Sequence, residues 1–86
     1  MEIETAKKIK AELTLALGKI GCSANKFVFD KSDEKSPISV CMGCHSPWLS
    51  GSKFEKLYDA VESVMKPQGL RTEICGDFVG TDLISL

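Results

Sequence analysis

The sequence predicts a small α+β domain: a mixed sheet of three or four strands with two helices packed on one face. Two segments, 3–20 and 53–66, carry apolar residues at helical spacing. The runs between and after them are short, rich in Phe, Ile and Val, and bounded by Gly, Pro or charged residues, as strands are. The expected order is α-β-β-α-β, with a final β left open. The 86 residues have room for one domain, 1–86, and no second core.

The first helix is expected over residues 3–20, with an apolar stripe of Ile3, Ala6, Ile9, Leu13, Ala16 or Leu17, and Ile20. Gly18 and Gly21 offer its end. Leu13, Leu15 and Leu17 also alternate as in a strand, but the good helix formers around them favour a helix.

Two strands should follow. Residues 26–30 place Phe27 and Phe29 on one face, and residues 38–41 return antiparallel to them. The connection, 31–37, is highly charged and closed by a proline, so a solvated loop is expected there.

The second helix has a clear predicted start, because Ser52-Lys53-Phe54-Glu55 matches a capping box. Its buried stripe is expected to consist of Phe54, Leu57, Tyr58, Val61, and Val64 or Met65. Pro67 and Gly69 end it. In the irregular segment before it, Trp48 is expected to hold the loop against the core.

A third strand is predicted over residues 70–79, and residues 82–86 are expected to form either a short fourth strand or a docked tail. If the strands on either side of the second helix are parallel, the connection is a right-handed crossover. Functional sites form in loops at the carboxyl ends of such strands. The loop at residues 41–45 lies at that place, so it is the candidate site.

The composition argues against two classes of protein, general nucleic-acid binders and membrane-spanning proteins. Eleven Lys and Arg against twelve Asp and Glu give a formal charge of −1, which argues against a general nucleic-acid binder. No apolar run approaches the roughly 20 residues needed to span a bilayer, and the polar N-terminus does not read as a signal peptide. We therefore expect a cytoplasmic protein with a protein partner.

The four cysteines are Cys22, Cys41, Cys44 and Cys75, and in a reducing cytosol stable disulfides are not the default. The leading hypothesis is a metal-binding accessory module. Cys41 and Cys44, two residues apart, can aim their sulfurs at one zinc ion, with Cys22 and Cys75 completing the sphere and His45 as an alternate ligand. Such zinc is structural if four protein ligands close the sphere. The same sulfurs suit an iron–sulfur cluster.

Other interpretations stay open. In a thiol–disulfide oxidoreductase, Cys41 would attack and Cys44 would resolve the mixed disulfide, although the helix at Ser52 starts too far away for its dipole to activate either thiol. Cys41, Cys44 and His45 also match the attachment motif of c-type haem. Finally, the cysteines can be simple core or loop residues of a metal-free protein-interaction module.

The second half of the chain combines the loop Cys41-Met42-Gly43-Cys44, the helix 53–66 and the segment Arg71-Thr72-Glu73-Ile74-Cys75-Gly76-Asp77. In this order they resemble the small thioredoxin-like proteins of the selenoprotein W kind and, less closely, the thioredoxin-like [2Fe–2S] ferredoxins. The resemblance implies redox-active Cys41 and Cys44, or cluster ligation. The chain departs from it in a longer loop after Cys44, an extra leading helix and hairpin, and no second cysteine after Cys75.

Overall fold

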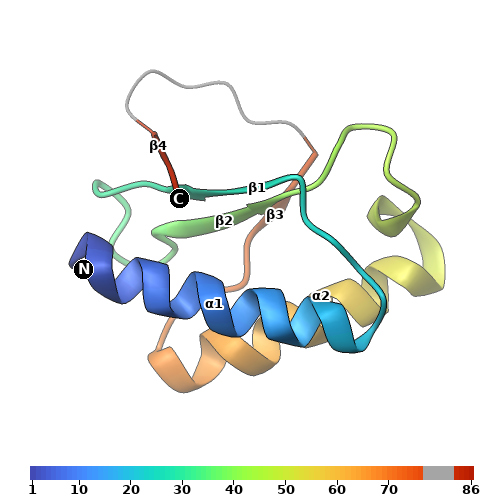
Figure 1. Cartoon of the computed structure of the whole chain (residues 1–86), viewed down its shortest axis with the longest axis horizontal. Coiled ribbons are helices and arrows are strands. Elements are labelled where there is room, and N and C mark those ends of the chain that lie inside the picture. The colour runs from blue at the N-terminus through green and yellow to red at the C-terminus, as the bar shows by residue number, and fades with distance from the viewer. Residues whose placement is uncertain (77–82) are drawn as a thin grey trace.

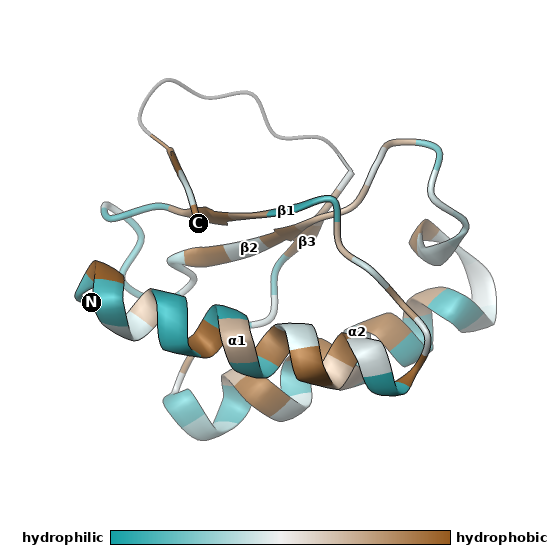
Figure 2. Ribbon diagram, viewed as in Figure 1, coloured by the Kyte–Doolittle hydropathy of each residue, from teal (hydrophilic) through white to brown (hydrophobic). Residues whose placement is uncertain are grey.

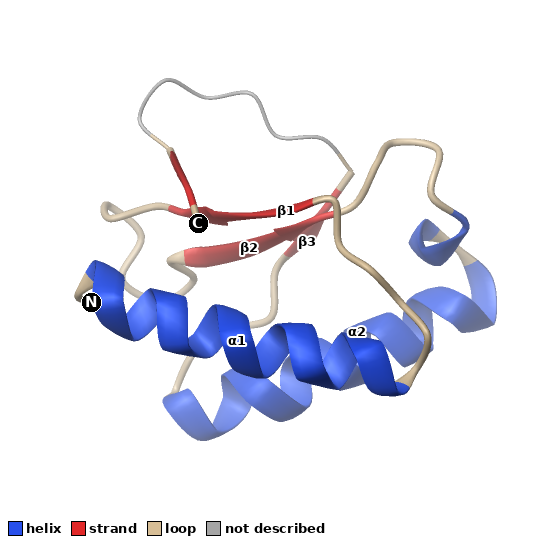
Figure 3. Ribbon diagram, viewed as in Figure 1, coloured by secondary structure: helices blue, strands red, loops and turns tan. Residues whose placement is uncertain are grey.

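The computed structural model describes residues 1–76 and 83–86, and these residues form an α+β domain with two helices and a mixed four-stranded sheet. The predicted fold class and element order are confirmed. The elements are α1 (Ile3–Lys19), β1 (Lys26–Phe29), β2 (Ile38–Cys41), α2 (Gly51–Met65), β3 (Ile74–Cys75) and β4 (Ile84–Ser85), with short 3₁₀ helices at Pro47–Leu49 and Lys66–Gln68. Both α-helices lie on one side of the sheet (Figures 1 and 3).

The strand order is β3-β2-β1-β4. β1 pairs with both β2 and β4 in antiparallel orientation, which confirms the predicted hairpin. β2 and β3 pair in parallel, with Val40 opposite Ile74 and Cys41 opposite Cys75. The segment from β2 through α2 to β3 is therefore the predicted parallel crossover.

Strand alternation divides the sheet into two faces. The face toward the helices supplies the core residues Phe27, Phe29, Ile38, Val40 and Met42. Teal and brown segments alternate along α1, and β2 is largely brown, as an amphipathic helix covering an apolar sheet should appear (Figure 2). By the same alternation, Lys26, Cys41 and Cys75 belong to the face turned away from the helices.

The predicted helix over residues 3–20 is confirmed, and the strand alternative for its leucines is wrong. α1 buries Ala6, Ile9, Leu13 and Leu17, whereas Leu15 is 70% exposed. Helical periodicity separates these leucines because positions two apart lie on different sides of a helix. The two helices also pack against each other, and neither is long and apolar enough to cross a membrane.

The predicted capping box at the start of α2 does not form. The helix begins at Gly51, and Ser50, its N-cap residue, makes no side-chain capping bond. Ser52 consequently lies inside the first turn, where its hydroxyl is not placed to cap the helix. Ser46 caps the preceding 3₁₀ helix instead, because its side-chain oxygen accepts a hydrogen bond from the Trp48 N–H at 3.2 Å.

The buried stripe of α2 is narrower than predicted. Leu57, Val61 and Met65 are buried, but Phe54 and Tyr58 are 36% and 39% exposed. These two rings lie at the margin of the stripe and contact each other, with centroids 6.3 Å apart. The helix ends as expected, in a 3₁₀ turn that contains Pro67 and stops at Gly69, whose φ of +72° is left-handed.

The charged loop after β1 is less solvated than predicted at its far end, where Ser36 and Pro37 are buried. The Ser36 hydroxyl donates to the Arg71 carbonyl at 3.1 Å, and the Arg71 N–H donates to the Lys35 carbonyl at 2.9 Å. This end of the loop is therefore tied to the segment that enters β3. Burial of this end of the loop costs little free energy because the polar groups that it buries are hydrogen-bonded.

The third strand is shorter than the predicted segment 70–79. Its pairing is limited to Ile74 and Cys75, while residues 77–79 lie outside the described part of the chain. Of the two alternatives predicted for residues 82–86, the strand is observed, because Ile84 and Ser85 pair with β1. Residue 82 also lies outside the described part of the chain.

The orientation of α1 gives a matched test. We expect Leu13→Ala to lower the free energy of unfolding by about 2–5 kcal/mol, since it removes a fully buried side chain. Leu15→Ala, the same change at an exposed position, should alter it by less than about 0.5 kcal/mol. Urea unfolding followed by circular dichroism measures both. Equal losses would contradict the helical face described here.

Candidate functional site

The feature with the clearest chemistry is a pair of thiols at the carboxyl ends of the parallel strands. Cys41 and Cys75 stand directly opposite each other in the β2–β3 register, and their sulfur atoms are 3.2 Å apart. Directly opposite residues project from the same face of a sheet. The two side chains therefore meet through the strand pairing, although they are 34 positions apart in the chain.

Backbone hydrogen bonds hold both cysteines in place. The Met42 N–H donates to the Cys75 carbonyl at 2.9 Å, and the Val40 N–H donates to the Glu73 carbonyl at 3.2 Å. On the other side of β2, the Asn25 N–H donates to the Cys41 carbonyl at 2.8 Å. The relative position of the two cysteine backbones is thus set by the sheet.

The two thiols differ in accessibility. Cys41 is fully buried, with 0% of its surface exposed, whereas Cys75 is partly exposed. The Cys75 thiol also approaches the Val40 carbonyl oxygen, at 3.7 Å. A reagent from solvent can therefore reach Cys75 but not Cys41 in this arrangement.

Burial raises the pKa of the Cys75 thiol from 9.0 to about 12, with the Cys41 hydrogen bond and charge as further causes. Two charged side chains act in opposite directions, since Glu73 raises this pKa and Lys26 lowers it. Cys75 is therefore a thiol and not a thiolate at neutral pH.

Lys26 and Glu73 are the site residues that the sequence analysis missed. Lys26 stands opposite Cys41 in the β1–β2 register, so Lys26, Cys41 and Cys75 form one row across three strands. Glu73 precedes Cys75 by two positions, and its charge acts on the Cys75 thiol. The predicted hairpin contained a signal for Lys26, because aligning the first residue of strand 26–30 with the last residue of strand 38–41 pairs Lys26 with Cys41, as observed.

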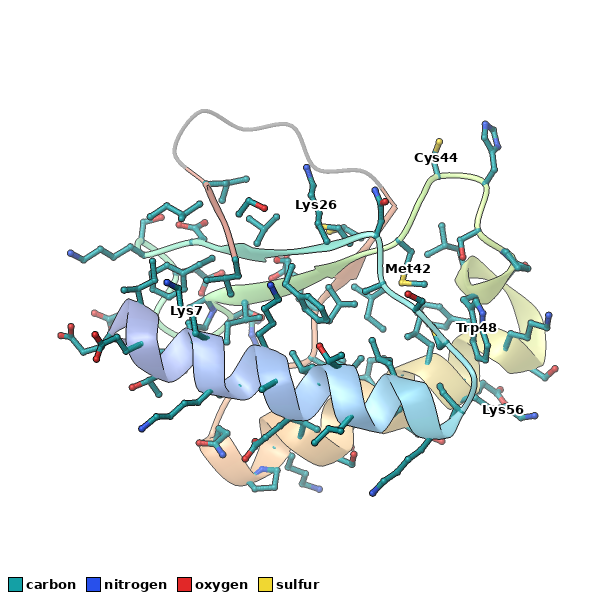
Figure 4. The ribbon with its side chains drawn as sticks, in the orientation of Figure 1. Lys7, Lys26, Met42, Cys44, Trp48 and Lys56 are labelled. Atoms are coloured by element: carbon teal, nitrogen blue, oxygen red, sulfur yellow. The ribbon has the colours of Figure 1, made fainter. Side chains whose placement is uncertain are left out.

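The C-x-x-C spacing does not bring Cys41 and Cys44 into equivalent environments. Cys44 is exposed, and its sulfur points away from the sheet in Figure 4. His45, the next residue, is exposed as well. The backbone of Cys44 stays close to the end of β3, since a methyl group added at Gly76 would lie 3.8 Å from the Cys44 Cα.

Cys22 lies apart from the thiol pair, in the core between the helices and the sheet. Its burial raises the pKa of its thiol, and it borders a small cavity of about 90 Å³ together with Thr14, Leu17 and Phe27. Within residues 1–76 and 83–86, no group of three or more His, Cys, Asp or Glu side chains is arranged to hold a metal ion. The four predicted sulfur ligands are thus not brought together in the described part of the chain.

The loop after β2 is anchored by aromatic and apolar contacts, as expected for Trp48. Its indole packs partly buried against the core, and the ammonium of Lys53 lies 5.7 Å from the ring centroid, within cation–π range. Met42, labelled in Figure 4 and 2% exposed, points toward the helices, while Lys26 extends from β1 on the other side. Met42 and Trp48, which precede and follow Cys44 in the chain, are therefore both packed against the core.

This arrangement can perform two-electron thiol chemistry: two neighbouring thiols, one of them accessible, can be oxidised to a disulfide. Adjacent strands lie about 4.7–4.9 Å apart, within the range of about 4.4–6.8 Å between Cα atoms that a disulfide needs. Comparison with protein-family models, curated proteins and solved structures finds no match to this chain.

Proposed function

We propose that the domain is a thiol–disulfide redox module in which Cys41 and Cys75 interconvert between a dithiol and a cross-strand disulfide. The observation that carries the proposal is the 3.2 Å separation of the two sulfurs on opposed positions of parallel strands. Closing to a disulfide requires the sulfurs to approach by about 1 Å, to about 2.05 Å. We expect rotation about the two χ1 angles to bring the sulfurs to this distance.

The reaction takes place in two exchange steps with a small disulfide, R–S–S–R. The accessible Cys75, once deprotonated, attacks one sulfur, forms a Cys75–S–S–R mixed disulfide and releases one RS⁻. The Cys41 thiolate then attacks the Cys75 sulfur and releases the second RS⁻. Two electrons pass from the protein to the reagent, and the protons lost by Cys41 and Cys75 end on the two released thiols.

This proposal keeps Cys41 from the sequence hypothesis but changes its partner from Cys44 to Cys75. The accessible thiol attacks first and the buried one resolves, because the reagent cannot reach Cys41. Cys44, exposed on its loop, is then a third thiol outside the redox pair. The α2 N-terminus plays no part, since its dipole acts over about one turn.

The zinc site remains a prediction. The redox pair needs only Cys41 and Cys75, whose sulfurs are 3.2 Å apart, whereas a structural zinc site needs four ligands. The described residues hold no group of three or more His, Cys, Asp or Glu side chains arranged around one point.

The first test is oxidation of the reduced protein with glutathione disulfide. We expect a mass loss of two hydrogen atoms and a single disulfide between Cys41 and Cys75, identified by peptide mapping. Because it closes a loop of 34 positions, this bond should stabilise the fold by about 2–4 kcal/mol, which raises the melting temperature by about 10 °C or more.

Matched serine variants assign the bond. Cys41→Ser and Cys75→Ser should abolish the stabilisation by oxidant, whereas Cys22→Ser and Cys44→Ser should retain it. A protein that oxidises only through Cys44, or that forms no intramolecular disulfide while remaining folded, would refute the proposed pair.

The pH dependence of oxidation provides a second test. The thiolate is the attacking species, and the pKa of Cys75 is raised to about 12, so the thiolate fraction grows tenfold per pH unit throughout the neutral range. The rate of disulfide formation should therefore rise about tenfold per unit from pH 6.5 to 8.5. Stopped-flow or quenched mass spectrometry measures it. A plateau below pH 7.5 would contradict a buried, protonated thiol.

Elemental analysis tests the metal hypothesis directly. Under the redox proposal, tag-free protein purified without added metal should contain well under 0.1 zinc or iron per chain (about background level) and should show no visible absorbance. One zinc per chain, with a melting temperature that falls on chelation, would instead establish the metal module.

A further inference from the structure

One exposed side of α2 carries two aromatic rings. Phe54 and Tyr58 are 36% and 39% exposed, and their ring centroids are 6.3 Å apart. Together with Glu55 and Asp59 they line an open pocket of about 370 Å³. Phe and Tyr are enriched in protein–protein interfaces, so this pair provides an apolar surface for contact with a second chain.

The two carboxylates beside the rings have no partner of their own. Within the part of the chain that the structure describes, the side chains of Glu55 and Asp59 form neither an ion pair nor a hydrogen bond. They lie one helical turn apart and repel each other. A cation bound between them would remove this repulsion and could also lie over the face of an aromatic ring. Arginine combines both contacts, because its planar guanidinium pairs with carboxylates and stacks on aromatic rings.

The pocket continues along α2 into a region of opposite charge. It shares Asp59 with a second pocket, which extends to Lys66, and Tyr58 with a third, which extends to Arg71. The side chains of Lys66 and Arg71 are exposed and form no ion pair or hydrogen bond among the described residues. Glu62 also lines the second and third pockets, and the two cations outnumber it there. We call the surface formed by these three adjoining pockets the α2 groove.

The length of the α2 groove matches a short extended peptide. The midpoint between Glu55 and Asp59 is position 57, nine residues before Lys66, and nine residues of an α-helix rise about 14 Å. An extended chain advances about 3.3 Å per residue and covers this distance in about four residues. Alternate side chains of an extended chain point to the same side, so three residues at alternate positions can contact α2.

We propose that the α2 groove binds an extended segment of a partner protein that carries an arginine, an apolar residue and an acidic residue at alternate positions. The arginine occupies the pocket formed by the two rings and the two carboxylates, and the acidic residue pairs with Lys66 and Arg71. The apolar residue lies between them and covers Tyr58. This inference involves none of the cysteines and is independent of the proposed redox function. It gives a chemical class to the protein partner expected from the sequence.

The test uses a synthetic peptide with this pattern, acetyl-Ala-Arg-Ser-Leu-Ser-Glu-Ala-amide, and isotopically labelled protein whose cysteines are kept reduced. We expect saturable binding with a Kd below about 1 mM, with changes in the amide NMR signals centred on residues 54–72. Peptides in which Gln replaces the arginine or the glutamate should bind about threefold or more weakly, because each loses a charge pair on a partly solvated surface.

Variants of the protein assign the contacts. Glu55→Gln and Asp59→Asn should each weaken binding of the arginine peptide by about threefold or more. They should have little effect on the peptide in which Gln replaces arginine, because the interaction they remove is already lost. Tyr58→Ala should weaken binding of both peptides. Glu12→Gln, a change of the same kind at an exposed position of α1, is the matched control and should leave the affinity unchanged.

The proposal is overturned if millimolar peptide shows no saturable binding, if the NMR changes centre outside residues 54–72, or if the arginine peptide and its Gln counterpart bind equally well. Sedimentation of the free protein examines the alternative occupant. A dimer that Tyr58→Ala dissociates would show that a second copy of this chain covers the groove, and would also overturn the proposal. Because none of these results depends on the Cys41–Cys75 disulfide, the redox function is tested separately.

Discussion

The parallel pairing of β2 with β3 is the constraint on which the site depends. Its register sets Cys41 opposite Cys75, and the hydrogen bonds from Met42 to Cys75 and from Val40 to Glu73 hold that register. A parallel pair needs a long connection, which α2 supplies while it covers the sheet with Leu57, Val61 and Met65. The crossover from β2 through α2 to β3 therefore both buries α2 and places the two sulfurs close together.

The buried surroundings of Cys41 and Cys75 are well suited to two protonated thiols. A thiol behaves as a small apolar group, so Cys41 can be fully buried without an unsatisfied charge. Low polarity around the pair keeps Cys75 protonated and restrains reactivity at neutral pH. The charge of Glu73 raises the pKa of Cys75 further, and that of Lys26 lowers it. The same two side chains can thus be packed within the fold and take part in the proposed thiol chemistry.

The sequence predicted most of the fold, because burial follows periodicity wherever an element is long enough to show it. α1 and the core of α2 extend over several turns, and the β1–β2 hairpin has flanking breakers. The thiol pair was not predicted as a pair. The i, i+3 spacing of Cys41 and Cys44 is visible in the sequence, whereas the partnership of Cys41 with Cys75 depends on the register of a strand of two residues. A strand so short has no period to detect. The capping box failed because α2 begins at Gly51, just after the 3₁₀ turn at Pro47–Leu49 and one residue before the motif.

The lengths of the outer strands have a consequence for solubility. β1 and β2 carry the sequences KFVF and ISVC, which are mostly apolar and rich in strand-forming residues. Such segments promote fibril formation when the edge of a sheet is open. Here they occupy the two central positions, and the described outer strands, β3 and β4, are each paired over only two residues. Short edges offer few free backbone groups for another chain to extend. β1 and β2 are therefore flanked by edge strands that are too short to pair extensively with a strand of another chain.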